Sequence, residues 1–167
     1  MKYSTQQIIL HWLSAIIIIW STLSGFYVAF FHPALPVKEW VGFFNVSLTT
    51  VFIPFFILRV WYLFKHGSPA ESLLTRREQQ IAHLGHLALY ANISVVLITG
   101  VLMMNHAIDV FHMFHVPQPL HNASIITFFN KVHVLACMTL ALLIAGHILA
   151  VLKHQLSGRH ILRNMCP

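Results

Sequence analysis

Two histidines, His133 and His147, stand fourteen residues apart inside one apolar stretch. Fourteen residues make close to four turns of an α-helix, so both imidazoles leave the same face, roughly 20 Å apart along the axis. A histidine in the hydrocarbon core of a membrane is costly and usually has a partner, often a metal. Two of them on one face predict ligands for two stacked metal centres, and haem iron is the leading candidate in a helical membrane protein.

The composition places these histidines in a membrane. Only 8% of the 167 residues are charged and 57% are hydrophobic, with a mean hydropathy of +0.74. Because a soluble domain carries about a quarter charged residues, the chain is predicted to be a membrane protein. Four apolar stretches are long enough to span a bilayer, at residues 8–31, 40–64, 81–104 and 127–152. Little sequence remains outside them, so residues 1–167 are predicted to form a single membrane domain.

The four stretches are predicted to be α-helices, because backbone polar groups in lipid have to be satisfied within their own segment. Ser4 with Gln7, and Thr75 with Glu78, form the capping-box pattern that opens the first and third helices. Pro54 lies inside the second helix and predicts a kink. The first stretch lacks a clear signal-peptide cleavage site and is interpreted as a retained helix. Short connections favour an all-α fold, a transmembrane antiparallel four-helix bundle.

The formal charge of +6 comes from basic residues at the helix ends, so no nucleic-acid partner is needed to explain it. Two basic groups follow the second and fourth helices, whereas only Lys38 and Lys131 lie near the opposite side. By the positive-inside rule, both termini are predicted to lie in the cytoplasm. The two groups are Lys65, Arg76 and Arg77, and Lys153, Arg159 and Arg163.

His11 lies near the cytoplasmic end of the first helix, at the depth predicted for His147 on the fourth. Two imidazoles at one depth can ligate one iron from opposite sides, which gives a six-coordinate, low-spin haem suited to electron transfer. The alternative is that each is an interfacial histidine solvated by lipid headgroups. The matched depth, and the position of His147 and His133 on one face, favour the ligand interpretation.

His133 lies near the external end of the fourth helix and has no obvious partner. The corresponding part of the second helix, residues 43–47, contains Asn45 and no histidine. The third helix ends in Met103 and Met104, and His106 follows in the loop. Methionine is a known axial ligand of haem iron, although a methionine at helical spacing also packs in cores. From the residue types alone, the ligand opposite His133 stays open.

Several motifs, in their order and spacing, resemble those of the bacterial cytochrome b561 family. They are Thr5-Gln6 before Leu10-His11-Trp12, Ala82-His83-Leu84-Gly85-His86, the pair His133 and His147, and the terminal Leu162-Arg163-Asn164-Met165-Cys166-Pro167. The resemblance covers essentially the whole chain. It implies a four-helix protein of the bacterial inner membrane with two b-type haems. One branch of the family acts as superoxide oxidase and passes the electron of superoxide to ubiquinone, and related bundles are the cytochrome b subunits of hydrogenases and formate dehydrogenases.

Carried over to this chain, the resemblance makes His11 and His147 the ligands of the cytoplasmic-side haem, and His133 a ligand of the external-side haem. The family's remaining ligand is a second-helix histidine followed by Val-Ser, and Asn45 stands in that place here. Three outcomes follow from this departure. His133 alone binds the second haem and leaves an open position, a methionine or a loop histidine substitutes, or the chain binds a single haem.

Three further residues are candidates for holding the cofactors. Arg59, one to two turns from the cytoplasmic end of the second helix, either snorkels to the headgroups or pairs with a propionate of the lower haem. His83 and His86, one turn apart at the start of the third helix, either support the lower haem or hydrogen-bond a quinone carbonyl. Their alternative interpretation is that of ordinary interfacial histidines.

The external loop, residues 105–126, carries His112 and His115 at a spacing that fits a surface metal site, with solvated loop histidines as the favoured alternative. Lys131, near the outer mouth, either attracts an anion such as superoxide or anchors its helix at the interface.

Together these features predict a membrane b-type cytochrome. It would carry single electrons from an external or periplasmic donor, in the sharper form superoxide, through haem b to ubiquinone in the membrane lipid. A haem-bearing anchor and electron conduit for a dehydrogenase or hydrogenase partner is the alternative, and a haem-free metal carrier is a third interpretation. The sequence contains no visible acid–base pair or nucleophile constellation, which argues against hydrolytic or group-transfer chemistry.

Overall fold

The computed structural model of the chain describes residues 4–66 and 74–159. Four long helices account for most of them: α1 Thr5–Phe31, α2 Leu35–His66, α3 Arg76–Leu102 and α4 Ala123–Leu156. They are 27 to 34 residues long, which at 1.5 Å per residue exceeds the roughly 30 Å hydrocarbon core of a bilayer. The predicted all-α four-helix architecture is therefore confirmed. Arg163 and the terminal motif of residues 162–167 lie outside the described residues.

Both predicted capping boxes are present. The Gln7 N–H donates to Ser4 Oγ over 3.3 Å, and the Gln7 side chain accepts from the Ser4 N–H over 3.0 Å. Glu78 and Thr75 make the same reciprocal pair at the start of α3, over 3.4 Å and 2.8 Å. Each box satisfies backbone donors that the helix itself leaves free, so the starts of α1 and α3 are fixed by local sequence.

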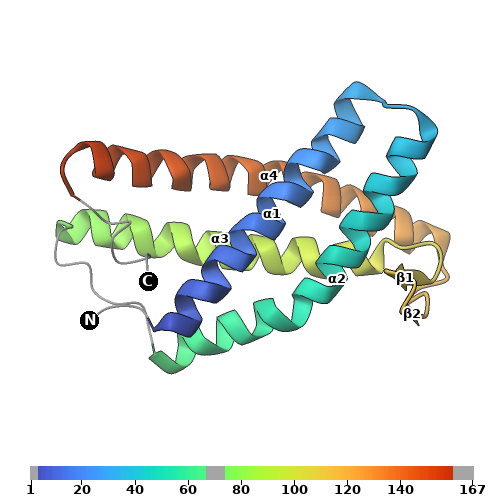
Figure 1. Ribbon diagram of the computed structural model, residues 1–167, viewed down its shortest axis with the longest axis horizontal. Coiled ribbons are helices and arrows are strands. Elements are labelled where there is room, and N and C mark those ends of the chain that lie inside the picture. The colour runs from blue at the N-terminus through green and yellow to red at the C-terminus, as the bar shows by residue number, and fades with distance from the viewer. Residues whose placement is uncertain (1–3, 67–73, 160–167) are drawn as a thin grey trace.

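The second helix begins at Leu35, five residues before the predicted start at residue 40. Pro36 lies in its first turn, where a missing N–H has no helical partner, so the proline starts the helix instead of delaying it. The preceding turn is made at His32, whose φ is 45°. Pro54 lies inside α2, and the two halves of that helix run in different directions in Figure 1, as the predicted kink requires.

The helices pack as two antiparallel pairs, α1 with α2 and α3 with α4, and the first pair crosses the second (Figure 1). The starts of α1 and α3 and the ends of α2 and α4 lie together at what we call the termini end of the bundle. Between the pairs lies an apolar core to which every helix contributes. It consists of Ile17, Phe52, Phe56, Ile93 and Leu140.

The connection between α3 and α4 contains a β-hairpin that the sequence analysis did not predict. β1 Ile108–Val110 pairs antiparallel with β2 Phe114–Val116, and the hairpin lies at the end of the bundle opposite the termini, which we call the hairpin end. Ile108 and Val110 are almost completely buried and pack against side chains of α2 and α3. Strands of three residues are too short to show a clear alternating pattern, which is why the hairpin escapes a sequence-based prediction.

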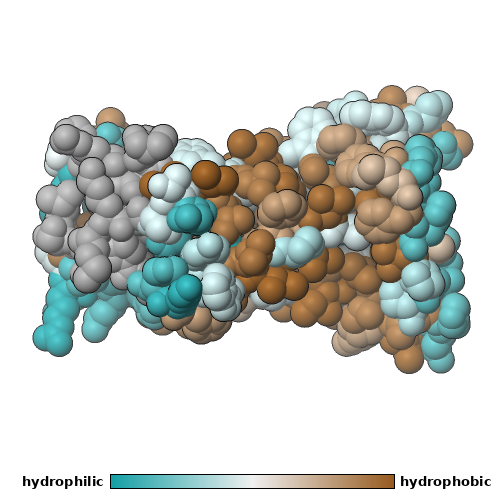
Figure 2. Space-filling model, turned by 60° about the horizontal axis from the view of Figure 1, so that its bottom comes forward, coloured by the Kyte–Doolittle hydropathy of each residue, from teal (hydrophilic) through white to brown (hydrophobic). Residues whose placement is uncertain are grey.

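The lateral surface of the bundle is apolar. Figure 2 shows a broad hydrophobic band between two more polar ends. Each of the four helices is long and apolar enough to cross a membrane, and large side chains on all of them are more than half exposed. Such a surface is stable in lipid and not in water, so the protein is a multi-pass membrane protein. Examples are Ile9, Ile16, Leu23, Ile57, Ile98, Leu135, Leu142 and Leu149.

Candidate functional site

Near the termini end, each of the four helices contributes one basic or imidazole side chain to a common cluster. His11 comes from α1, Arg59 from α2, His86 from α3 and His147 from α4, and Tyr90 of α3 joins them. The His86 and His147 rings lie 5.3 Å apart between centroids, and both are within electrostatic reach of His11. We call these five residues the termini-end cluster. The sequence analysis predicted that His11 and His147 lie at the same depth in the membrane, and this geometry is consistent with that prediction.

Arg59 turns into the bundle instead of extending to the surface. Its Nη2 lies 3.0 Å from His11 Nδ1, and its Nε donates to the Tyr90 hydroxyl over 3.1 Å. The guanidinium also lies over the Tyr90 ring, 5.0 Å from its centroid. Arginine has only donors, so His11 Nδ1 must accept, and the proton of a neutral His11 ring is then on Nε2. Arg59 thereby sets the tautomer of His11.

The two histidines at the start of α3, His83 and His86, lie in different surroundings. His86 is half-buried beside His147, whereas His83, one turn earlier, is exposed. The structure therefore brings His86 into the cluster and leaves His83 at the surface near the start of α3.

A cavity of about 350 Å³ lies between the two helical pairs, toward the hairpin end. All four helices line it, and Ile108 of β1 does so as well. Its polar wall comes from α1 and α2, with Ser21, Thr22, Asn45, Thr49 and Thr50. The facing wall includes Gly100 of α3, Met103 directly after α3, and His133 and Cys137 of α4. We call it the hairpin-end cavity.

His133 is held in one orientation on the α3/α4 wall. Its Nδ1 lies 3.1 Å from the Val96 carbonyl oxygen and 3.1 Å from Thr99 Oγ1. A carbonyl can only accept, so Nδ1 carries the proton and Nε2 keeps a lone pair, 3.4 Å from Cys137 Sγ. An Nδ1–H bonded to a backbone carbonyl is the arrangement by which proteins orient a metal-ligating imidazole.

Gly100 of α3 makes this approach of His133 possible. A Cβ built at Gly100 would lie 3.2 Å from His133 Cε1 and 3.6 Å from its Nδ1. Any larger residue would have to push the ring away, so the absence of a side chain at residue 100 is part of how His133 is positioned.

Asn45 lies on the opposite wall and is bonded within its own helical pair. Its Nδ2 donates to Ser24 Oγ over 2.9 Å, and Ser24 Oγ in turn donates to the Trp20 carbonyl over 2.7 Å. Ser21 Oγ, also on this wall, is buried and has no hydrogen-bond partner within the part of the chain that the structure describes. The wall that faces His133 thus offers an amide and hydroxyls.

The residues considered as alternative partners of His133 lie elsewhere or are already engaged. Met103 lines the cavity, but its Sδ lies 3.7 Å from Asn130 Nδ2. Met104 is buried against Ile108 and Val110 of the hairpin. Three loop histidines are held by their own neighbours, His106 by Asn105 and both His112 and His115 by Asp109. The fourth, His121, is exposed.

His112 and His115 are largely exposed and share the Asp109 carboxylate, the partner that the sequence analysis did not identify. Within residues 4–66 and 74–159, no group of three or more His, Cys, Asp or Glu side chains is arranged to hold a bare metal ion.

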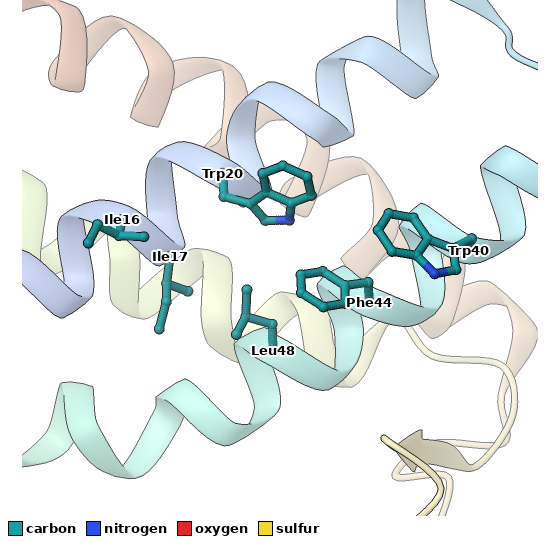
Figure 3. Close-up of a pocket in the computed structure, with 6 residues that line it drawn as sticks. All are labelled: Ile16, Ile17, Trp20, Trp40, Phe44 and Leu48. Atoms are coloured by element: carbon teal, nitrogen blue, oxygen red, sulfur yellow. The ribbon is translucent and has the colours of Figure 1, made fainter.

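A second hollow lies on the outer surface between α1 and α2 (Figure 3). Figure 3 shows that its lining is apolar, and Phe44 stacks on Trp40 with ring centroids 5.3 Å apart. It offers no group that could bind a metal or move a proton, and its Ile16 is 66% exposed on the apolar band. It is therefore part of the lipid-facing surface. Its lining residues are Ile16, Ile17, Trp20, Trp40, Phe44 and Leu48.

Sequence reasoning found the histidines, Arg59 and Asn45 but missed four residues that position them. Tyr90 stands one helical turn after His86, so helical spacing could have pointed to it. Gly100, Thr99 and Ser24 act through contacts between helices, which leave no signal in the spacing along one helix.

One comparison with known proteins matches almost the whole chain. The model of a family described as prokaryotic cytochrome b561 matches residues 2–167. Among curated proteins no match was found.

Proposed function

Because the chain belongs to the prokaryotic cytochrome b561 family, and is thus a membrane b-type cytochrome with a role in electron transfer, we propose that it passes single electrons from an external donor to ubiquinone. In this proposal the donor is superoxide. Each superoxide loses one electron and leaves as dioxygen, and two such electrons with two protons reduce one ubiquinone to ubiquinol. The single observation that carries the proposal is the meeting of His11, His86, His147 and Arg59 from four different helices at one depth.

The termini-end cluster has the donor set that a b-type haem needs. His11 and His147 would supply the axial imidazoles, and Arg59 a cation for a propionate. A ring whose Nδ1 accepts a bond from Arg59 has its proton on Nε2 and cannot offer that nitrogen to iron. Ligation through Nε2 therefore requires Arg59 to release His11, and the released guanidinium is then free for the propionate.

The hairpin-end cavity fits a second haem b through His133. Its ring already has Nδ1–H anchored on the Val96 carbonyl, and its Nε2, which would have to be released by the Cys137 thiol, has the lone pair for iron. Ser21 Oγ, buried and without a hydrogen-bond partner among the described residues, supports room for a further polar group in the cavity. When bound, haem b supplies a one-electron couple between ferric and ferrous iron. The protein's part is to hold each ring by imidazoles and to exclude water with the apolar band.

The distribution of basic residues supports an orientation with both termini in the cytoplasm. Lys65, Arg76, Arg77, Lys153 and Arg159 all lie at the termini end, as the positive-inside rule requires for the cytoplasmic side of the bacterial inner membrane. The hairpin end would then face the periplasm, where Lys131 is exposed near the start of α4 and can attract superoxide. His83 and His86 at the termini end are suited to hydrogen-bond a quinone carbonyl.

The test of this proposal is the haem content of the purified protein, from a pyridine haemochrome spectrum against amino-acid analysis. Two haems b per polypeptide are expected. His11→Ala and His147→Ala should each lose one haem, and His133→Ala should lose the other. His121→Ala, an exposed loop change, is the matched control and should keep both.

Electron flow is then followed in the holoprotein by stopped-flow spectroscopy. After rapid mixing with superoxide, the haem spectrum should change from ferric to ferrous during the stopped-flow measurement. Added ubiquinone should then reoxidise the haems. If superoxide does not reduce the haems while quinol still exchanges electrons with them, superoxide is not the donor. That result would favour the alternative function, an electron conduit for a partner dehydrogenase.

A further inference from the structure

We infer that the hairpin-end cavity binds a diatomic molecule of the size of dioxygen, on the side of the cavity that faces His133, beside the Asn45 amide. The inference rests on the proposed function for the presence of haem on His133. It adds a ligand site that electron transfer alone does not need.

The α1/α2 wall of the cavity has no side chain able to complete the coordination of iron. The protein ligands of haem iron are His, Met, Cys and Tyr. None of the α1 or α2 residues that line the cavity is of these types. The polar ones are the hydroxyls and the Asn45 amide described above, which are poor ligands for haem iron.

The two sulfur atoms of the cavity belong to the same wall as His133. Cys137 lies one turn further along α4, with Sγ 3.4 Å from His133 Nε2. Met103 directly follows α3, and its Sδ contacts Asn130 of α4. Both therefore approach from the α3/α4 pair, whereas a second axial ligand has to come from the opposite side of the haem.

The α1/α2 wall, which faces His133, has room for a small molecule. Gly25 and Gly42 line the cavity from α1 and α2, and a Cβ built at either would meet nothing within 4 Å. Ser21 Oγ on the same wall is buried without a partner among the described residues. Open space with an unpaired polar atom is a place for a small guest that accepts or donates a hydrogen bond.

The Asn45 amide can donate a hydrogen bond to such a molecule. Its Nδ2 has two hydrogens, and the hydrogen-bond partner found for it in the described structure is Ser24. Ser24 Oγ in turn donates a hydrogen bond to the Trp20 carbonyl, so the Asn45 amide is held in place by contacts within the α1/α2 pair. One N–H remains for a ligand, and a fixed donor beside an open coordination position stabilises a polarised diatomic molecule.

The test uses carbon monoxide as the probe on the reduced, purified holoprotein. An optical difference spectrum should show one carbon monoxide bound for every two haems. His133→Ala should remove the haem that binds it. Asn45→His provides a second imidazole on the facing wall, so it should abolish carbon monoxide binding and the high-spin ferric signal while two haems remain.

Asn45→Ala is the matched control for Asn45→His. It keeps the position open, so carbon monoxide still binds, but the lost hydrogen bond should shift the Fe–CO stretching band. Dissociation should become about twofold faster, the lower end of what one hydrogen bond contributes.

The outcomes separate this inference from the proposed function. Two haems per polypeptide with no carbon monoxide binding would overturn the ligand site and leave the electron-transfer proposal standing. A single haem that survives His133→Ala would overturn both the second haem and this inference. Carbon monoxide binding that persists undiminished in Asn45→His, with both haems present, would show that the ligand does not bind beside Asn45.

Discussion

His133 is positioned by groups of a single neighbouring helix. Val96, Thr99 and Gly100 of α3 supply, in order, a carbonyl for Nδ1–H, a hydroxyl beside it, and the space that the ring occupies. Each group acts on a different degree of freedom: the tautomer, the ring rotation and the distance between α3 and α4. The ring is therefore fixed before any cofactor binds, which lowers the cost of ordering it on binding.

The glycine contact gives a prediction at the scale of one residue. Gly100→Ala places a methyl group 3.2 Å from His133 Cε1, so the ring has to shift by a few tenths of an ångström and its Nδ1 bonds lengthen. We expect weaker haem retention on His133, seen as a haem count below two per polypeptide or as a changed spectrum of that haem alone.

Gly85→Ala is the matched control on the same helix, because a Cβ there meets nothing within 4 Å. That change should leave the haem count unaltered and raise helix stability by up to about 1 kcal/mol. Equal haem loss in both variants would contradict the role given to Gly100.

At the scale of elements, the β-hairpin contains a turn whose backbone conformation is unfavourable for the two residues that form it. Phe111 and His112 have φ of 49° and 58°, and the left-handed region costs a non-glycine residue roughly 1–2 kcal/mol. Contacts with α2 offset this cost. Phe43 stacks on His112 with centroids 4.7 Å apart, and the Ser47 hydroxyl donates to the Asp109 carbonyl over 3.1 Å and accepts from the Phe111 N–H over 3.2 Å.

Ser47 therefore fixes the hairpin that closes the hairpin-end cavity through Ile108. Ser47→Ala leaves a partly buried carbonyl and a partly buried N–H without this partner, so local stability should fall by about 1 kcal/mol. Hydrogen–deuterium exchange of residues 108–116 should become faster. Ser94→Ala, whose hydroxyl bonds the Tyr90 carbonyl of its own helix, is the control. Unchanged exchange in Ser47→Ala would show that apolar packing of the hairpin suffices.

At the scale of the whole molecule, the two helical pairs meet in the mid-bundle core and at both candidate sites. His11 and Arg59 face His86 and His147 across the pairs at the termini end, and Asn45 and His133 do so across the hairpin-end cavity. A group bound between the pairs at either place would link them. Binding to the folded bundle alone would also stabilise it by mass action.

Haem removal should therefore lower thermal stability. At a free haem concentration of about 100 times the dissociation constant, the linkage contributes about 3 kcal/mol. His11→Ala should lower the melting temperature in detergent, and His121→Ala, which leaves the contacts between pairs intact, should not. A melting temperature that does not depend on haem occupancy would contradict the role of haem as a link between the pairs.

The sequence by itself determined the four helices, their capping boxes, the kink-forming Pro54 and the pair His133 and His147 on one helix. These features depend on local chemistry: apolar length, side chains that cap a nearby backbone, and spacing along one helix. The resemblance to the family rested on that histidine pair together with short motifs such as residues 10–12 and 82–86, and the match over residues 2–167 confirms the family.

The tertiary structure alone decided which side chains meet between helices. The bonds of Arg59 to His11 and Tyr90, the pairing of Asn45 with Ser24, and the close approach of Gly100 to His133 could not be predicted from spacing. The physical reason is that lipid-exposed helices are apolar all round. Their sequences carry little amphipathic signal to tell which face turns inward, so only packing between helices chooses it.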